Sequence, residues 1–373
     1  MKIYRKSAFD KWKFEDKSIQ CIITSIPYYS LRKYNIPDII IGGDESCEHK
    51  FEIITHPIQG GHNKVDNMPI EYQSQYCIKC NAWQGQYGLE PSYLDYIEHT
   101  QLWAKEAWSI LKGDGIFWLN IGDSYNNVSS RVGRQDKSKY GGKSGLYCLR
   151  GGNKNYNSKC QFLIPHRIAI ALIDNGWILR NTIIWYKTNG MPESCNDRFS
   201  KKHEYIFMFV KKQKYYFNLD AVREPYKEVS MQRLQRAVSN KNKKENNPHL
   251  LRIKEKEYKE RIGSMQSTKF NGGDYLVGNL NPKGKNPGDV FSIPTQPSPY
   301  CHYAMFPEKL VERLILCSTM EGDIVLDPFC GSGTTILVAE RHNRIGYGID
   351  LGYEDIQKDR LSKLQRKLSL KVI

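Results

Sequence analysis

Hydrophobic and polar positions follow two patterns along this chain, short apolar runs and helical periodicity. Short apolar runs between turn residues are typical of buried strands, whereas apolar residues three and four positions apart indicate helices. Apolar runs predict strands at 19–25, 115–125, 178–188, 203–212, 322–329 and 344–350. Helical periodicity predicts helices at 90–115, 165–177, 306–320 and 333–343. This alternation favours an α/β fold with a mostly parallel, doubly wound sheet.

Proline and glycine residues refine the expected ends of two of these elements. The strand at 19–25 is expected to end at the turn around Pro27, in the stretch "TSIPYYSLRKY". The helix at 90–115 is expected to carry Pro91 in its first turn and to end at Gly113 and Gly115.

Length and composition are those of a globular protein with a substantial core. The chain has 373 residues, of which 40% are hydrophobic and 25% charged. No apolar run approaches the roughly 18–20 residues that span a bilayer, and the first 20 residues lack the apolar core of a signal peptide. We therefore expect a cytoplasmic protein with no membrane partner. Its 10 cysteines then favour free thiols or metal ligands over disulfides.

Positive charge is concentrated in two segments. The formal net charge is +15, and 126–160 and 221–289 each contribute a net +7 by count of their charged residues. Both segments are rich in Gly, Asn and Ser and poor in large aliphatic residues, as expected of loops that contact a phosphate backbone. These basic segments (126–160 and 221–289) favour nucleic acid as a partner.

A glycine-rich turn near the C-terminus indicates a nucleoside-containing ligand. In "VLDPFCGSGTTILVAERHNRIGYGID" a predicted strand runs through Asp327 into Gly331 and Gly333 and then into a helix. Such a turn lets a ligand approach the backbone closely beside a helix N-terminus. Asp350 follows 19 residues after Gly331, where a carboxylate commonly binds ribose hydroxyls. A phosphate-binding Gly-Lys-Ser/Thr motif is missing, which disfavours a triphosphate, while NAD remains open on spacing alone.

Two motifs together resemble one enzyme family. "DPFCGSGTT" resembles the S-adenosylmethionine-binding motif of the methyltransferases that modify exocyclic amines of DNA bases, and "TSIPYY" resembles their catalytic motif, Ser/Asp/Asn-Pro-Pro-Tyr/Phe. The catalytic motif comes first, as in the permuted beta class. The resemblance covers most of the chain apart from the basic segments and 42–80. It implies a Rossmann-like methyltransferase fold in circularly permuted order, with S-adenosylmethionine as cofactor and double-stranded DNA as partner.

The resemblance also implies catalytic roles. The Ser25 side chain and the Ile26 carbonyl would accept the two N–H groups of the target amine, Pro27 would constrain the turn, and Tyr28 would stack on a base flipped out of the helix. Ile26 stands where the family pattern has a second proline, but a main-chain carbonyl serves from either residue. In the family, Ser at the first position accompanies cytosine N4 methylation, so this reaction is predicted, with adenine N6 methylation as the alternative. Methylation at cytosine C5 is disfavoured because no proline is followed by cysteine.

The cofactor pocket is carried over from the family motif by motif. Asp350 corresponds to the ribose carboxylate, Asp10 to an acidic position near the adenine, and His302 and Phe306 to the border of the methionine moiety, although a packed surface histidine fits His302 equally well. No catalytic role is assigned to the "HEY" at 203–205. The expected cofactor-binding residues are Asp10, Thr24, His302, Phe306, Asp327, Phe329, Gly331, Ser332, Gly333, Thr334 and Asp350.

The segment 42–80 carries a separate pattern of soft ligands. Cys47-x-His49 and Cys77-x-x-Cys80 form two close pairs separated by a polar loop, which suits a tetrahedral structural zinc ion. His56 or His62 could replace His49, and unliganded thiols in a loop are the alternative.

The expected organisation follows from these motifs. Residues 1–41 and 81–220 form the catalytic half, 42–80 the Cys/His insert, 126–160 a DNA-contacting loop, 221–289 the target-recognition region and 290–373 the cofactor-binding half. Homodimerisation and a separately encoded restriction endonuclease are compatible with this organisation. Two alternatives come from other functional classes. One is a non-catalytic nucleic-acid-binding module on a degenerate methyltransferase fold. The other is methylation of RNA or of a protein glutamine.

Overall fold

The computed structural model describes residues 1–373 apart from 57–69, 127–155, 230–231, 233–280, 298–304 and 370–373. The chain forms two compact units, one from Met1–Asn218 together with Asp289–Ile373 and one from Leu219–Gly288. Among the described residues, no helix has the length and apolar character needed to cross a bilayer.

The larger unit is built on an eight-stranded sheet within the described part of the chain. Strand β9 runs antiparallel to both of its neighbours, and every other neighbouring pair is parallel. The predicted mostly parallel α/β sheet is thus confirmed. In spatial order the strands are β1 (Lys2–Arg5), β12 (Ile345–Asp350), β11 (Ile324–Asp327), β2 (Ile19–Ser25), β7 (Leu111–Ile121), β9 (His203–Val210), β8 (Ile178–Tyr186) and β10 (Val290–Ser292).

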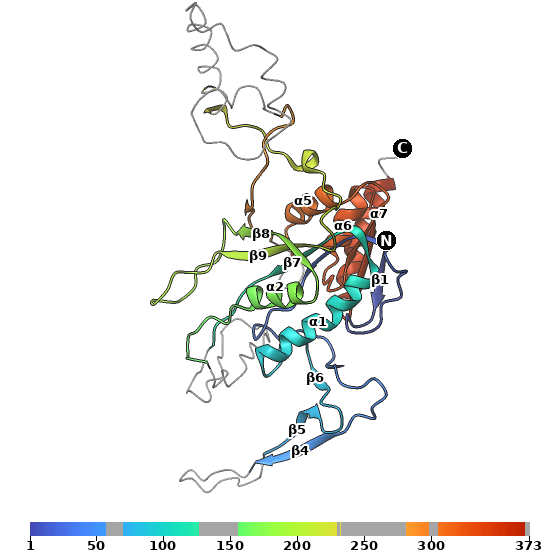
Figure 1. The fold of residues 1–373 in the computed structure, drawn as a ribbon, viewed down its shortest axis with the longest axis vertical. Coiled ribbons are helices and arrows are strands. Elements are labelled where there is room, and N and C mark those ends of the chain that lie inside the picture. Colours follow the sequence, from blue (N-terminus) through green and yellow to red (C-terminus); the bar gives the residue numbers. More distant parts are fainter. Residues whose placement is uncertain (57–69, 127–155, 230–231, 233–280, 298–304, 370–373) are drawn as a thin grey trace, which may run out of the picture. The chain divides into compact units, whose positions relative to one another are not determined.

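Helices cover both faces of this sheet, and their order in the chain explains why. From the adjacent strands β2 and β11, the chain crosses to β7 in one direction and to β12 in the other. Right-handed crossovers therefore place the two connecting helices on opposite faces, as Figure 1 shows for α1 and α6. The helices are α1 (Tyr93–Ile110), α2 (Ile164–Asp174), α5 (Glu308–Ser318), α6 (Thr334–Arg341) and α7 (Glu354–Ser369).

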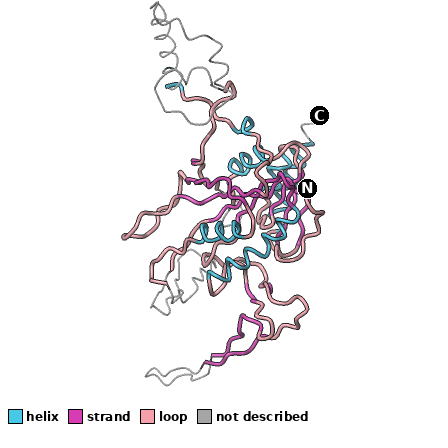
Figure 2. The backbone as a smooth tube through the Cα atoms, viewed as in Figure 1, coloured by secondary structure: helices cyan, strands magenta, loops and turns pink. Residues whose placement is uncertain are grey.

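The direction of the crossovers reverses between β2 and β11, and this leaves a crevice at the carboxyl ends of the two strands. Such a crevice is the usual ligand position in an open α/β sheet. Figure 2 shows the strands gathered between the two helical layers. Large aromatic side chains on β7, β9 and α1, including Phe117, Phe207 and Trp103, are fully buried and make the sheet a rigid base for that crevice.

Helix α1 starts and ends differently from the prediction. Its N-cap is Ser92, whose hydroxyl accepts the Leu94 N–H at 3.1 Å, so Pro91 precedes the helix. The helix ends at Ile110, not at the glycines, and β7 begins directly at Leu111. Pairing of Leu111 with Ile19 of β2 draws this residue into the sheet, so tertiary pairing prevails over helical periodicity.

Other elements escaped prediction because their local signals are weak. Strands β1 and β10 are four and three residues long. Helix α7 is mostly polar, and its position follows from contacts with the glycine-rich turn described below.

The Cys/His insert (42–80) and the two strands that flank it form a smaller antiparallel sheet. Its strands, in spatial order, are β3 (Ile39–Ile41), β6 (Trp83–Gly85), β5 (Ile70–Cys77) and β4 (Phe51–His56). Trp83 pairs with Ile41 on β3 and with Tyr76 on β5, and thereby joins the flanking strand β3 to the strands of the insert.

The basic segments lie largely outside the described residues, so their DNA-contacting and target-recognition roles remain predictions. In the smaller unit the structure describes a short 3-10 helix at Leu219–Val222 and a bridge between Glu224 and Lys285. Gly284 is required at this bridge because a Cβ there would lie 2.2 Å from the Glu224 carbonyl oxygen.

Candidate active site at the carboxyl edge of the sheet

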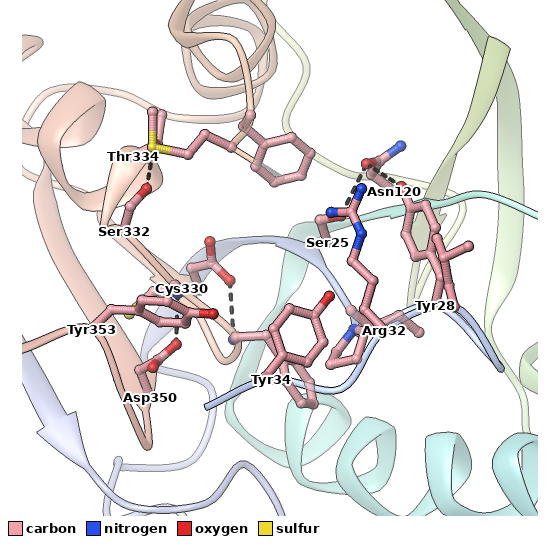
Figure 3. Close-up of a pocket in the computed structure, with 18 of the residues that line it drawn as sticks. Ser25, Tyr28, Arg32, Tyr34, Asn120, Cys330, Ser332, Thr334, Asp350 and Tyr353 are labelled. Carbon is pink, nitrogen blue, oxygen red and sulfur yellow. Dashed lines mark hydrogen bonds between the residues drawn. The ribbon is translucent and has the colours of Figure 1, made fainter. Parts of the chain in front are cut away.

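A pocket of about 710 Å³ opens where four neighbouring strands end. Ser25 ends β2, Asp327 ends β11, Asp350 ends β12, and Asn120 is the penultimate residue of β7. All four line the pocket. Figure 3 shows two groups of side chains, with Ser25, Tyr28 and Asn120 at one end and Asp350, Tyr353 and Ser332 at the other. The adjacent strand ends thus bring residues from distant parts of the chain together.

Most of the predicted site residues line this single pocket. They are Ser25, Ile26, Pro27, Tyr28, Phe306, Asp327, Phe329, Gly331, Ser332, Thr334 and Asp350.

Three predicted cofactor residues do not line the pocket. Thr24 is fully buried, since alternation along β2 points its side chain away from the face that Ser25 uses. Asp10 is exposed and its carboxylate accepts the Ser7 N–H at 2.8 Å, so it shapes the turn that carries Ser7 into the lining. Gly333 caps α6 in a left-handed conformation. His302 lies outside the described residues.

The Ser25 hydroxyl is held in a defined orientation. It donates to Asn120 Oδ1 at 3.1 Å, and the Asn120 amide nitrogen donates to the Tyr205 carbonyl at 3.1 Å. The second bond fixes which end of the amide faces Ser25. Because the hydroxyl proton is directed to Asn120, the lone pairs of Ser25 Oγ stay available as acceptors.

The Tyr28 phenol is tied to the same network. Its hydroxyl donates to Glu204 Oε2 at 2.6 Å and lies 3.1 Å from Asn120 Oδ1, while Lys187 forms an ion pair with Glu204. Burial, together with the Glu204 carboxylate, raises the pKa of Tyr28 well above its usual value. The phenol therefore keeps its proton and acts as a donor. A Cβ at Gly122 would lie 2.6 Å from the ring, so Gly122 makes room for it.

Packing stiffens the turn that contains Ile26. The Ile26 side chain is only 2% exposed and belongs to the main hydrophobic core. The Tyr96 hydroxyl donates to the Pro27 carbonyl at 2.6 Å. Gly88, in a left-handed conformation, packs against Pro27 and accepts the Ser30 N–H through its carbonyl at 2.7 Å. Side-chain burial and these two bonds constrain the turn where a second proline is missing.

At the opposite end, one carboxylate organises the glycine-rich turn. Asp350 Oδ2 accepts the Gly331 N–H at 2.6 Å and Oδ1 accepts the Gly352 N–H at 2.7 Å. Burial raises the pKa of Asp350 to about 6, although these two backbone bonds favour its charged form. Gly331 has a φ of 48°, in the left-handed region, which brings the turn backbone close to the pocket.

Asp327 supports the same turn from beneath. Its carboxylate accepts the Phe329 N–H at 3.1 Å and the Thr335 hydroxyl at 2.7 Å, so it links the end of β11 to the first turn of α6. Complete burial raises the pKa of Asp327 to about 7.

Helix α7 braces the turn through two side chains that sequence reasoning missed. The Arg360 guanidinium donates to the Ser332 hydroxyl at 2.7 Å and to the Thr334 hydroxyl at 2.9 Å, and it is 8% exposed. Gln357 donates to the Gly331 carbonyl. The loop Gly331–Thr334 is therefore pre-organised by residues from a helix that the sequence pattern did not predict.

The catalytic end also contains residues that were not anticipated. Asn120, Lys187, Lys201 and Glu204 all line the pocket, and burial lowers the pKa of Lys201. The available signal for Asn120 was a polar residue that interrupts a long apolar strand directly before its end, in "FWLNIGD". For Glu204 it was a carboxylate at the start of the apolar run "HEYIFMFV".

The predicted metal ligands also come together. Cys47, His49, Cys77 and Cys80 each offer one ligand atom, and these atoms lie within 4.8 Å of one another. His62 lies outside the described residues.

Comparisons with known proteins agree with this geometry. The family described as DNA methylase (N6_N4_Mtase) matches residues 19–359. The chain is 31% identical over 318 residues to the Type II methyltransferase M.SmaI of Serratia marcescens, covering 85% of this chain and 91% of that protein. It is 29% identical over 346 residues to the Type II methyltransferase M.Cfr9I of Citrobacter freundii, covering 92% and 81%.

A solved structure supports the fold separately. The PvuII DNA methyltransferase, described as cytosine-N4-specific, aligns with a TM-score of 0.52 and 16% identity, covering 98% of this chain and 92% of that one. At this identity the likeness establishes the methyltransferase fold alone. Since the family match spans nearly the whole chain and includes both ends of the pocket, this protein belongs to the N6/N4 DNA methylase family.

Proposed function

We propose that this DNA methyltransferase transfers the methyl group of S-adenosylmethionine to the exocyclic N4 amine of cytosine in double-stranded DNA. The observation that carries the proposal is the Ser25 hydroxyl, whose proton is directed to Asn120 at one end of a pocket whose other end is a carboxylate-anchored glycine turn. One cavity thus contains both a hydroxyl oxygen that can accept an amine N–H and a site for a nucleoside.

The cofactor end has the chemistry that S-adenosylmethionine needs. Asp350 offers carboxylate lone pairs to ribose hydroxyls, and the Gly331 turn allows close backbone approach beside α6. Phe329 and Tyr353 add aromatic surface to the lining. When bound, this cofactor supplies a methyl group activated by a sulfonium centre. The residues of this end would bind and orient the cofactor.

The catalytic end would prepare the amine. The amine of cytosine is a weak nucleophile because its lone pair is delocalised into the ring. Ser25 Oγ and the Ile26 carbonyl would each accept one N–H, which favours a pyramidal nitrogen with its lone pair exposed. Asn120 is the positioning residue for Ser25, because its side-chain oxygen accepts the hydrogen bond from the Ser25 hydroxyl. Otherwise the hydroxyl proton would compete with the incoming N–H. Methylation leaves the amine with one surplus proton, which would pass to solvent.

Tyr28 would hold the flipped base through its ring. The bond to Glu204 fixes the ring orientation, and the Glu204–Lys187 ion pair fixes the carboxylate. Stacking on an aromatic face is worth about 1–3 kcal/mol per base. Lys201 also lines this end of the pocket, whereas the charge of Lys187 is balanced by the Glu204 carboxylate.

Cytosine is proposed over adenine because Ser25 occupies the first position of the catalytic motif. Adenine N6 methylation by the same residues is the alternative. A non-catalytic nucleic-acid-binding role is disfavoured, because a binding module has no need for a glycine turn braced by Asp350 and Arg360. We further propose that the basic segments contact DNA, that the enzyme acts in the cytoplasm, and that a homodimer and a separately encoded restriction endonuclease are compatible partners.

The test is mass spectrometry of nucleosides from the DNA of a host that expresses the protein. Ser25→Ala is the test variant, and Ser362→Ala, which removes an exposed hydroxyl on α7, is the matched control. We expect N4-methylcytosine with the native chain and with Ser362→Ala, and its loss with Ser25→Ala. The same variants are assayed in vitro with labelled S-adenosylmethionine on a duplex DNA library and on RNA.

Each outcome decides one part of the proposal. N6-methyladenine that depends on Ser25 would keep the mechanism and overturn the choice of base. Methyl transfer to RNA but not to duplex DNA would overturn the acceptor. No transfer to any nucleic acid by a chain that binds S-adenosylmethionine would overturn the reaction.

A further inference from the structure

The ligand atoms of Cys47, His49, Cys77 and Cys80 form one cluster, although Cys47 and Cys77 are 30 residues apart in the chain. We propose that this cluster binds one structural zinc(II) ion through three thiolates and one imidazole nitrogen, and that the ion stiffens one wall of the methyltransferase pocket. The second part rests on the proposed function. The first part does not.

Two of the separations between ligand atoms are close to those expected around a tetrahedral zinc ion. The Cys47 and Cys77 sulfur atoms are 4.0 Å apart, and Cys80 Sγ lies 3.3 Å from His49 Nδ1. With Zn–S near 2.3 Å and Zn–N near 2.0 Å, ligand atoms around a tetrahedral ion lie about 3.5–3.8 Å apart. These two separations lie just above and just below this range, and all four ligand atoms lie within 4.8 Å of one another. A disulfide would need sulfur atoms about 2 Å apart, and these cysteines are all free.

The surrounding backbone is shaped for the cluster. Cys77 ends β5, its N–H donates to the Ala82 carbonyl at 2.8 Å, and the Lys50 N–H donates to its sulfur at 3.3 Å. Gly43 has a φ of 74°, and a Cβ there would lie 2.8 Å from the Cys80 sulfur. The chain thus places a glycine where a side chain would collide with a ligand atom. Four protein ligands fill a tetrahedral shell, which is typical of a structural site.

The insert also lacks the apolar core that would stabilise it otherwise. Within 42–80, Cys77 is the one buried apolar side chain among those whose burial the structure describes. Ile41 and Trp83, on the two flanking strands, belong to the main hydrophobic core. Ile40, Ile53 and Ile78 are 41%, 68% and 50% exposed. Sheets of this size commonly depend on a metal or disulfides for stability. Zinc binding would displace the three thiol protons to solvent and join the loop after β3 to the turn after β5.

The strands that leave the cluster continue directly into the pocket. Strand β6 follows Cys80, pairs with β3, and is followed at once by Gln86, which lines the pocket. The Gln86 side chain accepts the Tyr34 N–H at 3.0 Å and donates to the Ile36 carbonyl at 2.7 Å. Tyr34 and Ile36 line the pocket too. An ion that fixes β3 against β6 therefore fixes this wall.

Metal content of the full-length chain, purified under reducing conditions without chelator, tests the site. We expect about one zinc per chain, retained in Cys160→Ser, which removes an exposed thiol outside the cluster, and lost in Cys77→Ser and Cys80→Ser. Cobalt(II) added to zinc-depleted native chain should give the visible bands of a tetrahedral site and thiolate charge-transfer absorption. The cobalt spectrum needs no variant, so it decides the matter even where a cysteine variant fails to fold.

Two results would overturn the site: a native chain that binds neither zinc nor tetrahedral cobalt at one equivalent, or a Cys80→Ser chain that retains full zinc. The effect on the pocket is measured as affinity for S-adenosylmethionine by calorimetry, and we expect zinc depletion to weaken it about tenfold. Unchanged affinity would overturn the role in the pocket wall and leave the metal site standing. Metal stoichiometry is independent of methyl transfer, so failure of the proposed function gives a different result.

Discussion

Ser25 and Asn120 are direct partners across the parallel pair of β2 and β7, and the Ser25 hydroxyl donates to the Asn120 side-chain oxygen at 3.1 Å. Strand register alone brings them together, because both side chains stand on the same face of the sheet at the same height. The Asn120 amide is then oriented by the Tyr205 carbonyl on β9. Three adjacent strands thus determine where the Ser25 lone pairs point.

Replacing Asn120 should therefore impair turnover without weakening cofactor binding. In Asn120→Ala the Ser25 hydroxyl loses its acceptor and its proton competes with the amine N–H, so we expect kcat to fall about 100-fold, as for loss of one oriented hydrogen bond in an active site. Affinity for S-adenosylmethionine should stay within about twofold. Methyl-transfer kinetics and calorimetry measure the two quantities. Asn175→Ala, an exposed helix-end change, is the control. Weaker cofactor binding in Asn120→Ala, equal to the loss of kcat, would contradict the role assigned to Asn120.

Tyr28 should act mainly through its ring. Tyr28→Phe keeps the aromatic face and loses the bond to Glu204, so we expect kcat/KM to fall about tenfold or less. Tyr28→Ala also loses stacking, and this loss should lower kcat/KM by about a further 10- to 100-fold. Tyr29→Phe is the matched control, since Tyr29 is buried outside the pocket lining and, among the described residues, its hydroxyl makes one long bond of 3.5 Å to the Pro91 carbonyl. Equal losses in the Phe and Ala variants would show that the hydroxyl, not the ring, matters.

Removal of the Asp350 carboxylate should weaken cofactor binding selectively. Asp350→Ala removes the proposed ribose acceptor and releases the Gly331 N–H, so the Kd for S-adenosylmethionine should rise about 10- to 100-fold. At saturating cofactor, kcat should recover most of its native value. Calorimetric titration measures the Kd, with the exposed change Asp355→Ala as control. A native Kd in Asp350→Ala would place the nucleoside elsewhere.

Deprotonation of Asp327 should lower the free energy of unfolding as pH rises. Its pKa is about 7 in the folded state against 3.8 for the ordinary group. The folded state therefore binds more protons between pH 4 and 7, and the free energy of unfolding falls across this window, by at most about 4 kcal/mol from this group. Asp327→Asn can keep an acceptor for the Thr335 hydroxyl and removes the titration.

The measurement is the melting temperature of native chain and Asp327→Asn at pH 5, 6, 7 and 8. Relative to the native chain, the melting temperature of Asp327→Asn should increase as pH rises from 5 to 7. The difference in melting temperature should level off above pH 7. Asp355→Asn, on an exposed surface, should show no such trend. A difference between Asp327→Asn and native that is constant with pH would mean that the Asp327 carboxyl does not titrate in this range.

The sequence alone determined the features that depend on local pattern. Apolar runs and helical periodicity identified β2, β11, α6 and β12 and their mostly parallel arrangement. The glycines after Asp327 and the spacing to Asp350 indicated the nucleoside end, because a turn with left-handed glycine and a carboxylate at the next strand end is encoded within about 25 residues. The catalytic stretch around Ser25 was found through its resemblance to a family motif.

Only the tertiary structure decided which side chains complete the pocket. Asn120 is 95 residues from Ser25 and Glu204 is 176 from Tyr28, so their contacts depend on strand order and register, which local periodicity does not encode. Arg360 reaches Ser332 from a polar helix whose position depends on packing. Thr24 was assigned to the cofactor by its place in the motif, but strand alternation turns it away from the pocket. Local pattern thus specified most of the longer elements, and the register of the assembled sheet specified which side chains complete the site.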